Sequence, residues 1–140
     1  MSDQIDVNQL GNALQQKVDL PSGKSQADID YVIEWKAPTS SDPTWYRKYK
    51  SGWVEQGGTT EAIQVGTSQT VNLLVTMSNT NYHIDLTMWR VNTDDVQFVP
   101  ANNYNSITTT SFILLNSRYT GSGTDTFCTK WEVKGFAATS

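Results

Sequence analysis

The chain has little of what holds many proteins together covalently or anchors them in a membrane. Its 140 residues include one cysteine, Cys128, and one histidine, His83. A single cysteine excludes an intrachain disulfide, and a single imidazole cannot form the histidine cluster of a zinc site. No run of 18 apolar residues occurs, and the N-terminus lacks a basic region followed by an apolar stretch and a cleavage site. We therefore expect neither a membrane span nor a secretion signal.

Positive charge is also scarce. The chain has 10 lysines and arginines against 14 aspartates and glutamates, a net charge of -4. Binding to nucleic acid depends on clustered basic side chains that release counterions from phosphates, so this balance argues against it. The one basic cluster is Arg47, Lys48 and Lys50. Trp45 and Tyr49 flank this cluster, which favours solvated positions on a half-exposed strand.

Catalytic motifs are missing as well. The sequence contains no G-x-S-x-G elbow, Walker loop, H-E-x-x-H or G-x-G-x-x-G motif. His83 stands where a turn enters a strand, which is typical of a structural or exposed loop histidine. The sequence therefore predicts that the protein is not an enzyme and uses no cofactor and no metal.

The enzymatic alternative is cleavage of a glycan, which requires two carboxyl groups about 5–10 Å apart. Asp94 and Asp95 are adjacent in sequence but belong to a turn signal, where neighbouring side chains usually diverge. Three glutamates fall on expected strands and could approach one another across a sheet: Glu34, Glu55 and Glu132. Nothing in the sequence selects among them.

Near the N-terminus the apolar residues follow a helical period. Val7, Leu10, Leu14 and Val18 are spaced by 3, 4 and 4 residues, which predicts a helix with one apolar stripe. Pro21 ends it, so at most about four turns are available, and a helix this short is marginal alone. The stripe must pack on the rest of the chain or on copies of itself. We place the boundary of this N-terminal segment and its linker at residues 1–28.

Residues 29–140 show the alternation of β-strands and no helical pattern. We expect strands at 29–36, at 45–58 as a hairpin, and at 61–65, 70–77, 82–91, 96–99, 106–115 and 126–136. Turn signals separate them, including Ser78–Asn81 and the pair Asn102 and Asn103. Many short strands without intervening helices predict an all-β domain, an antiparallel β-sandwich. In the last strand, Phe127, Thr129, Trp131 and Val133 should share one face.

Two stretches carry a resemblance to a known family. The first is the hairpin Trp45-Tyr46-Arg47 through Gly52-Trp53-Val54-Glu55-Gln56-Gly57-Gly58, and the second is the closing strand with Trp131 and Gly135-Phe136. They resemble the "WYR…DGW.EQGG" hairpin and the "W…GF" strand of bacteriophage tail-fibre and virion-fibre C-terminal domains. Ser51 stands where that hairpin often carries Asp. The segment 8–19 also resembles short helical units that form trimeric stems in such proteins.

The resemblance implies a homotrimeric fibre component of a virion, made in a bacterial cytoplasm. Its N-terminal segment would attach to other virion proteins, and its head would bind a bacterial surface polysaccharide or protein. Strands that look apolar on both faces, at 71–77 and 112–115, agree with a second face that meets another subunit. A sandwich curled around a single core explains the same pattern. The alternative function is a head-fibre or decoration protein without a receptor.

Three loop clusters combine amides with an aromatic ring, the mixture that recognises sugars and adapts to partners. They predict the receptor-binding residues, which are Asn81, Tyr82, His83, Asn102, Asn103, Tyr104, Arg118 and Tyr119. Large aromatics within strands, such as Trp45, Trp53 and Trp131, are more often buried, so we expect them to be structural.

Overall fold

The computed structural model describes residues 25, 29–91, 100–118 and 126–139, and these residues are entirely β-strand, turn and irregular chain. All sheet pairs are antiparallel, as the sequence predicts. The strands are β1 (Val32–Lys36), β2 (Trp45–Tyr49), β3 (Trp53–Thr59), β4 (Ile63–Gln64), β5 (Ser68–Asn72), β6 (His83–Arg90), β7 (Pro100–Asn105), β8 (Ser111–Arg118) and β9 (Thr126–Phe136). Val32–Ser140 forms one compact unit.

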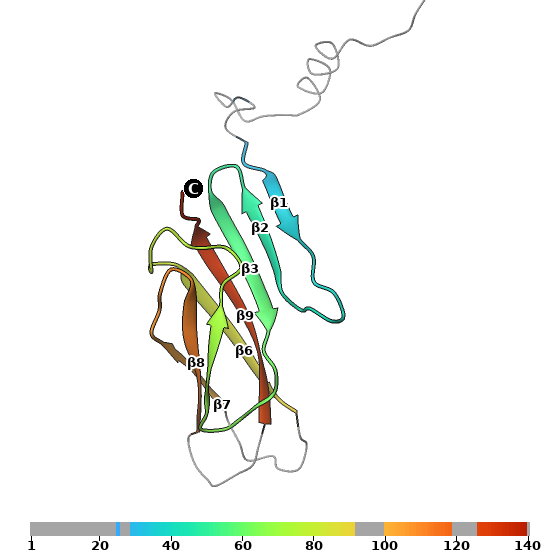
Figure 1. Cartoon of the computed structure of the whole chain (residues 1–140), viewed down its shortest axis with the longest axis vertical. Helices are drawn as coiled ribbons and strands as arrows, with labels where there is room; N and C mark the ends of the chain where they lie inside the picture. The colour runs from blue at the N-terminus through green and yellow to red at the C-terminus, as the bar shows by residue number, and fades with distance from the viewer. Residues whose placement is uncertain (1–24, 26–28, 92–99, 119–125, 140) are drawn as a thin grey trace, which may run out of the picture. The chain divides into compact units, whose positions relative to one another are not determined.

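The larger sheet is built around β9. On one side β9 pairs with β3 and then with the short β4, and on its other side it pairs with β6. The sheet continues from β3 to β2 and β1. Figure 1 shows β1, β2, β3, β9 and β6 lying side by side. We call β1, β2 and residues 37–44 between them the wing.

The smaller sheet has the order β5-β8-β7, and the core lies where it packs on the larger sheet. From β9 the core takes Trp131 and Val133, which alternate with exposed or half-buried residues. From the smaller sheet it takes Val71, Phe112 and Leu114, and the rings of Phe112 and Trp131 meet edge to face at 6.2 Å. The architecture is therefore a two-layer antiparallel sandwich. The predicted inward face of the last strand is confirmed, with Phe127, Thr129, Trp131 and Val133 all buried.

The hairpin predicted at 45–58 is present as β2 and β3. Its turn is the three-residue loop 50–52, closed by a hydrogen bond from the Gly52 N–H to the Tyr49 carbonyl at 2.9 Å. Gly52 has φ of 88°, a left-handed conformation that L residues with a side chain rarely adopt. Three-residue hairpin loops place a residue of this conformation at their end, which explains the Ser-Gly sequence.

The glycines of the hairpin and of the last strand make room for neighbouring large residues. A Cβ on Gly57 would lie 2.9 Å from two carbons of the Trp45 indole. A Cβ on Gly58 would lie 3.1 Å from the Trp131 indole, on the opposite face of β3. Gly135 gives the same room to Met77 and Tyr82. These motif residues therefore serve the packing of the sandwich.

Gln56 is fully buried and replaces a missing strand partner. Its Oε1 accepts hydrogen bonds from the N–H groups of Leu74 at 2.7 Å and Val75 at 2.9 Å, and its Nε2 donates to the Val75 carbonyl at 2.9 Å. Buried backbone groups without hydrogen-bond partners cost free energy. The Gln56 amide supplies partners for residues 74 and 75, and this allows the segment 73–77 to leave the smaller sheet. Met77 then bridges to Ala137 beside the last strand.

This crossing corrects the strand predicted at 70–77. The strand ends at Asn72, because the next peptide groups bond to Gln56 and to Thr110 instead of a sheet neighbour. The apolar run at 71–77 is thus not a strand with two apolar faces. Val71 and Met77 are buried in the core of their own chain, while Leu74 is 39% exposed. The strand expected at 61–65 is reduced to the two residues of β4.

Two further boundaries differ from the prediction. Asn102 and Asn103 were expected in a turn but belong to β7, where they pair with Asn116 and Leu115. Backbone pairing does not depend on the side chain, so Asn is accepted in this edge strand. Residues 106–110, expected as strand, form a turn in which the Thr108 hydroxyl accepts hydrogen bonds from the N–H groups of Thr110 and Ser111. The predicted N-terminal helix and the strand at 96–99 lie outside the described residues.

Candidate functional site

The strand register gathers polar and aromatic side chains on the face of the larger sheet that points away from the core, which we call the outer face. Residues paired across strands share a face, and the side-chain direction alternates along each strand. One row across this face consists of Trp45, Gly57, Glu132 and Asp85. The next row consists of Thr59, Lys130 and Thr87. A surface with both rings and hydrogen-bonding groups follows from the register alone.

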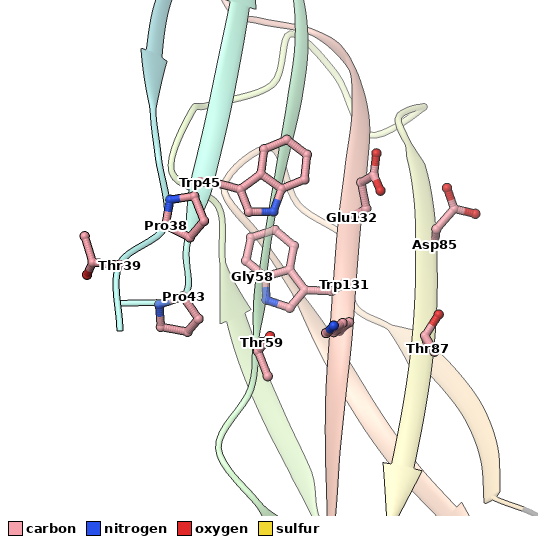
Figure 2. A pocket seen from close by; sticks show the side chains of 11 residues that line it. Pro38, Thr39, Pro43, Trp45, Gly58, Thr59, Asp85, Thr87, Trp131 and Glu132 are labelled. Carbon is pink, nitrogen blue, oxygen red and sulfur yellow. The ribbon is translucent and has the colours of Figure 1, made fainter. Parts of the chain in front are cut away.

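A groove of about 470 Å³ runs over these two rows, between the wing and β6. Pro38, Pro43 and Trp45 line it from the wing, and Asp85, Thr87 and Glu132 line it from the opposite strands (Figure 2). Gly57 has no side chain on this face, and the Trp45 ring lies over it in the space that a Cβ would take. The ring therefore packs flat against β3 and forms one wall of the groove.

The two carboxylates of the groove lie opposite each other on neighbouring strands, as Cα partners. Glu132 accepts a hydrogen bond from Lys134 at 2.9 Å through Oε1, and Asp85 Oδ1 lies 3.0 Å from His83 Nε2. Within the described part of the chain the second oxygen of each carboxylate makes no hydrogen bond. Chiefly because of its hydrogen bond to Glu132, the pKa of Lys134 is raised above its ordinary value. The groove therefore offers two oriented acceptors beside a charged ammonium.

Lys130, in the second row, adds a cation to the lining of the groove. Its ammonium lies 5.8 Å from the centroid of the Trp89 ring, within the range of a cation–π contact. With Asp85 and Glu132 it gives the lining one positive and two negative side chains.

A second, smaller pocket of about 290 Å³ adjoins the first on the wing and shares Pro38 and Trp45 with it. Trp35 and Arg47 complete its rim. Trp35 is 68% exposed, the largest exposed fraction among the exposed large hydrophobic residues of the described chain. The Arg47 guanidinium stands 6.0 Å from the centroid of the Trp45 ring. Two indoles therefore border two adjoining depressions.

Polar contacts on the opposite face of the wing hold its shape. The Lys36 ammonium donates to Asp42 Oδ2 and to Thr44 Oγ1, each at 2.6 Å, which ties β1 to the loop that precedes β2. Glu34 accepts hydrogen bonds from the Tyr46 hydroxyl at 2.7 Å and from Lys48 at 3.2 Å. Both carboxyl pKa values are lowered, that of Asp42 chiefly by Lys36 and that of Glu34 chiefly by the Tyr46 hydroxyl. These contacts position Pro38, Pro43 and Trp45.

The predicted receptor residues do not gather in one place. Asn81 and His83 are exposed at the start of β6, in the larger sheet. Asn103 and Tyr104 are exposed on β7, in the smaller sheet. Arg118 ends β8 opposite Pro100, four pairs along the ladder from Tyr104, which is about 13 Å of strand. Asn102 pairs with Asn116 between them, and Tyr119 lies outside the described residues.

Tyr82, one of the predicted receptor-binding residues, is buried in the core. Only 8% of it is exposed, and its hydroxyl donates to the carbonyls of Thr108 at 2.9 Å and Ser111 at 3.3 Å. From residue 82 the side chains alternate between the core and the surface, and Tyr82 is one of those that face the core. The stem residues Val7, Leu10, Leu14 and Val18 lie outside the described residues.

Sequence reasoning missed Trp35, Asp85, Thr87 and Lys130 as surface residues of a groove, and it assigned Trp45 to packing. Trp45 does pack on Gly57, yet it also lines both pockets. The signal that could have placed the Trp45 ring across the outer face is Gly57 on the neighbouring strand, since a glycine in a strand often marks a close approach.

Comparisons with known proteins identify the fold. The chain is similar to an N-truncated R1-type pyocin tail fibre, with a TM-score of 0.53 and 15% identity over 75% of this chain and 88% of that one. It is also similar to an N-truncated R2-type pyocin tail fibre, with a TM-score of 0.50 and 11% identity over 75% of this chain. The C-terminal part of the P. aeruginosa R2 pyocin fibre matches with a TM-score of 0.50 and 11% identity over 74% of this chain.

These likenesses establish a class of fold, that of phage-tail-like fibre domains. The chain spans 39% of the R2-type tail fibre and 26% of the longer P. aeruginosa R2 fibre. No protein-family model and no curated protein matches it. The fibre-domain fold expected from the hairpin and the closing strand is therefore supported.

Two other features bear on the site. None of the described residues forms a helix that could cross a membrane. In the same part of the chain no three histidine, cysteine or acidic side chains come together as metal ligands.

Proposed function

We propose that the protein is a fibre component of a phage or phage-tail-like particle, and that it attaches the particle to a bacterial surface receptor. The observation that carries the proposal is the likeness of its sandwich to pyocin tail fibres that share no more than 15% of its residues. The wing also exposes Trp35 together with Val32 and Ile33, which adds support because grouped exposed apolar side chains mark interaction sites. The protein works as a homotrimer in this proposal, and its N-terminal segment contacts other particle proteins.

The proposed activity is binding without cleavage. A general acid for glycan hydrolysis needs a carboxyl group kept protonated, usually by an apolar surround. The Asp85 and Glu132 side chains are 54% and 37% exposed, and each already faces a basic side chain. Incubation with bacterial capsule or lipopolysaccharide should therefore release no new reducing ends, and their appearance would show that the protein is an enzyme.

The experiment for adhesion applies fluorescently labelled full-length protein to a panel of bacterial strains. Saturable binding to some strains and not others is the expected result, and pre-incubation with polysaccharide from a binding strain should compete. Heat-unfolded protein is the control for nonspecific adsorption. Absence of binding to every strain of the host range of the particle would favour the decoration protein over the adhesin.

A further inference from the structure

We infer that the receptor is a neutral saccharide chain and that it lies across Trp45, with one sugar in the groove between the wing and β6 and the next in the pocket beside Trp35. This inference rests on the proposed function and gives its receptor a place and a chemistry. It assigns binding to the outer face of the larger sheet and not to the Asn-rich segments of the smaller sheet.

The shape of the surface is the first argument. The two depressions, about 470 and 290 Å³, meet at Pro38 and Trp45, and together they fall in the size range of ligand clefts, about 300–1,000 Å³. Because the two depressions share Pro38 and Trp45, consecutive units of one chain can occupy both. A polymer therefore suits the surface better than an enclosed small molecule.

The chemistry of the lining is the second argument. Sugars present C–H faces that pack on indoles and hydroxyls that need acceptors and donors. Trp45 and Trp35 supply the indoles, and the free oxygens of Asp85 and Glu132 supply the acceptors. Thr59 and Thr87 add hydroxyl groups along the next row.

The charge of the lining is the third argument, because it selects among glycans. Asp85 and Glu132 face the groove with Lys130 as the single cation among its lining residues. Arg47 stands near the Trp45 ring and is the Cα partner of Glu55 on the next strand. In the groove a polyanionic chain would meet two carboxylates, whereas a chain of neutral sugars meets acceptors for its hydroxyl groups. The smaller pocket is lined by Arg47 and by Lys36, which pairs with Asp42.

The rigidity of the wing is the fourth argument. Trp45 is fixed between Arg47 and Gly57, and the loop before it is held by Asp42 and Lys36. A ring that is already ordered loses little entropy when a sugar packs on it, so the site is prepared before binding.

The test measures the affinity of the full-length chain for the surface polysaccharide of a strain that the wild-type protein binds, by isothermal titration calorimetry. Trp35→Ala and the double variant Asp85→Asn with Glu132→Gln should each weaken binding at least tenfold. Tyr104→Ala on β7 and Glu61→Gln, both at exposed positions outside the groove, are the matched controls and should change affinity less than twofold. A polyanionic glycan such as polysialic acid should not compete.

The outcomes separate the inference from the proposed function. If the wild-type protein binds cells but the groove variants bind as well as it does, the site assignment is wrong and the adhesin remains. If Tyr104→Ala alone abolishes binding, the receptor lies on the smaller sheet. If Trp35→Ala changes the mass measured by light scattering, the face is a contact between copies of the chain and the inference fails. If the wild-type protein binds no strain, both proposals fail.

Discussion

At the scale of single residues, the motif that resembles phage fibres is explained by packing. Gly57 and Gly58 lie under two indoles on opposite faces of β3, and Gly135 lies against Met77 and Tyr82. Gln56 is a buried amide that makes three hydrogen bonds to the backbone of residues 74 and 75 and one to the Met77 sulfur. These residues serve the packing of the sandwich, so they predict the fold and carry little information about the receptor.

Substitution of Gln56 by leucine should destabilise the domain by about 3 kcal/mol. The leucine has a similar size but leaves two backbone N–H groups and one carbonyl without partners, and each buried group of this kind costs about 1–3 kcal/mol, less where water or local movement compensates. Urea unfolding at pH 7, followed by circular dichroism, measures the change. Gln64→Leu, at an exposed position of β4, is the control and should stay within about 0.5 kcal/mol of wild type. Equal stabilities of the two variants would contradict the role of Gln56.

At the scale of elements, the wing differs from the rest of the sheet. β3, β9 and β6 have the core beneath them, whereas β1 carries four exposed residues among its five. Its order depends on polar contacts made by Glu34 and Asp42. The order of the wing should therefore change with pH under conditions in which the core stays folded.

Acid should loosen the wing before it unfolds the sandwich. The folded-state pKa values of Asp42 and Glu34 are lowered from 3.8 and 4.5, so their stabilising contribution is complete at neutral pH. It is lost as the pH falls below about 4 toward the lowered folded-state values. Hydrogen–deuterium exchange at pH 7 and pH 3, corrected for intrinsic rates, should show faster opening of the β1 and β2 amides relative to the β3 and β9 amides.

The double variant Glu34→Gln with Asp42→Asn is the control for this pH effect. Its wing should open at similar corrected rates at both pH values, because the titrating groups are gone. A wild-type wing that is equally protected at pH 3 and pH 7 would show that these carboxylates contribute nothing to its order.

At the scale of the whole molecule, assembly remains a prediction. The apolar stripe of Val7, Leu10, Leu14 and Val18 needs a partner surface, and three copies would also raise the avidity of a weak glycan site by orders of magnitude. The described residues leave Trp35, Ile33 and Phe136 more than half exposed. The sequence pattern and the resemblance thus predict a trimer, and the test is a measurement of the mass of the protein in solution.

Static light scattering of the full-length protein should give a mass near three times the 15.6 kDa of one chain. Leu10→Asp with Leu14→Asp should shift the mass toward one chain, because charges interrupt the stripe. Asn12→Asp with Gln16→Glu adds the same charge on the opposite side of the predicted helix and should leave the trimer intact. A monodisperse wild-type monomer would rule out this assembly.

Period-two alternation and turn residues are local properties, so they suffice to predict the all-β class, the hairpin at 45–58, and the strand at 126–136 with its inward face. The sequence could not place residues 73–77 or Asn102 and Asn103, since their partners, Gln56 and β8, are distant in the chain. The groove was decided by tertiary structure alone. Trp45, Asp85 and Glu132 come from three strands, and only their register brings a ring and two carboxylates to one face.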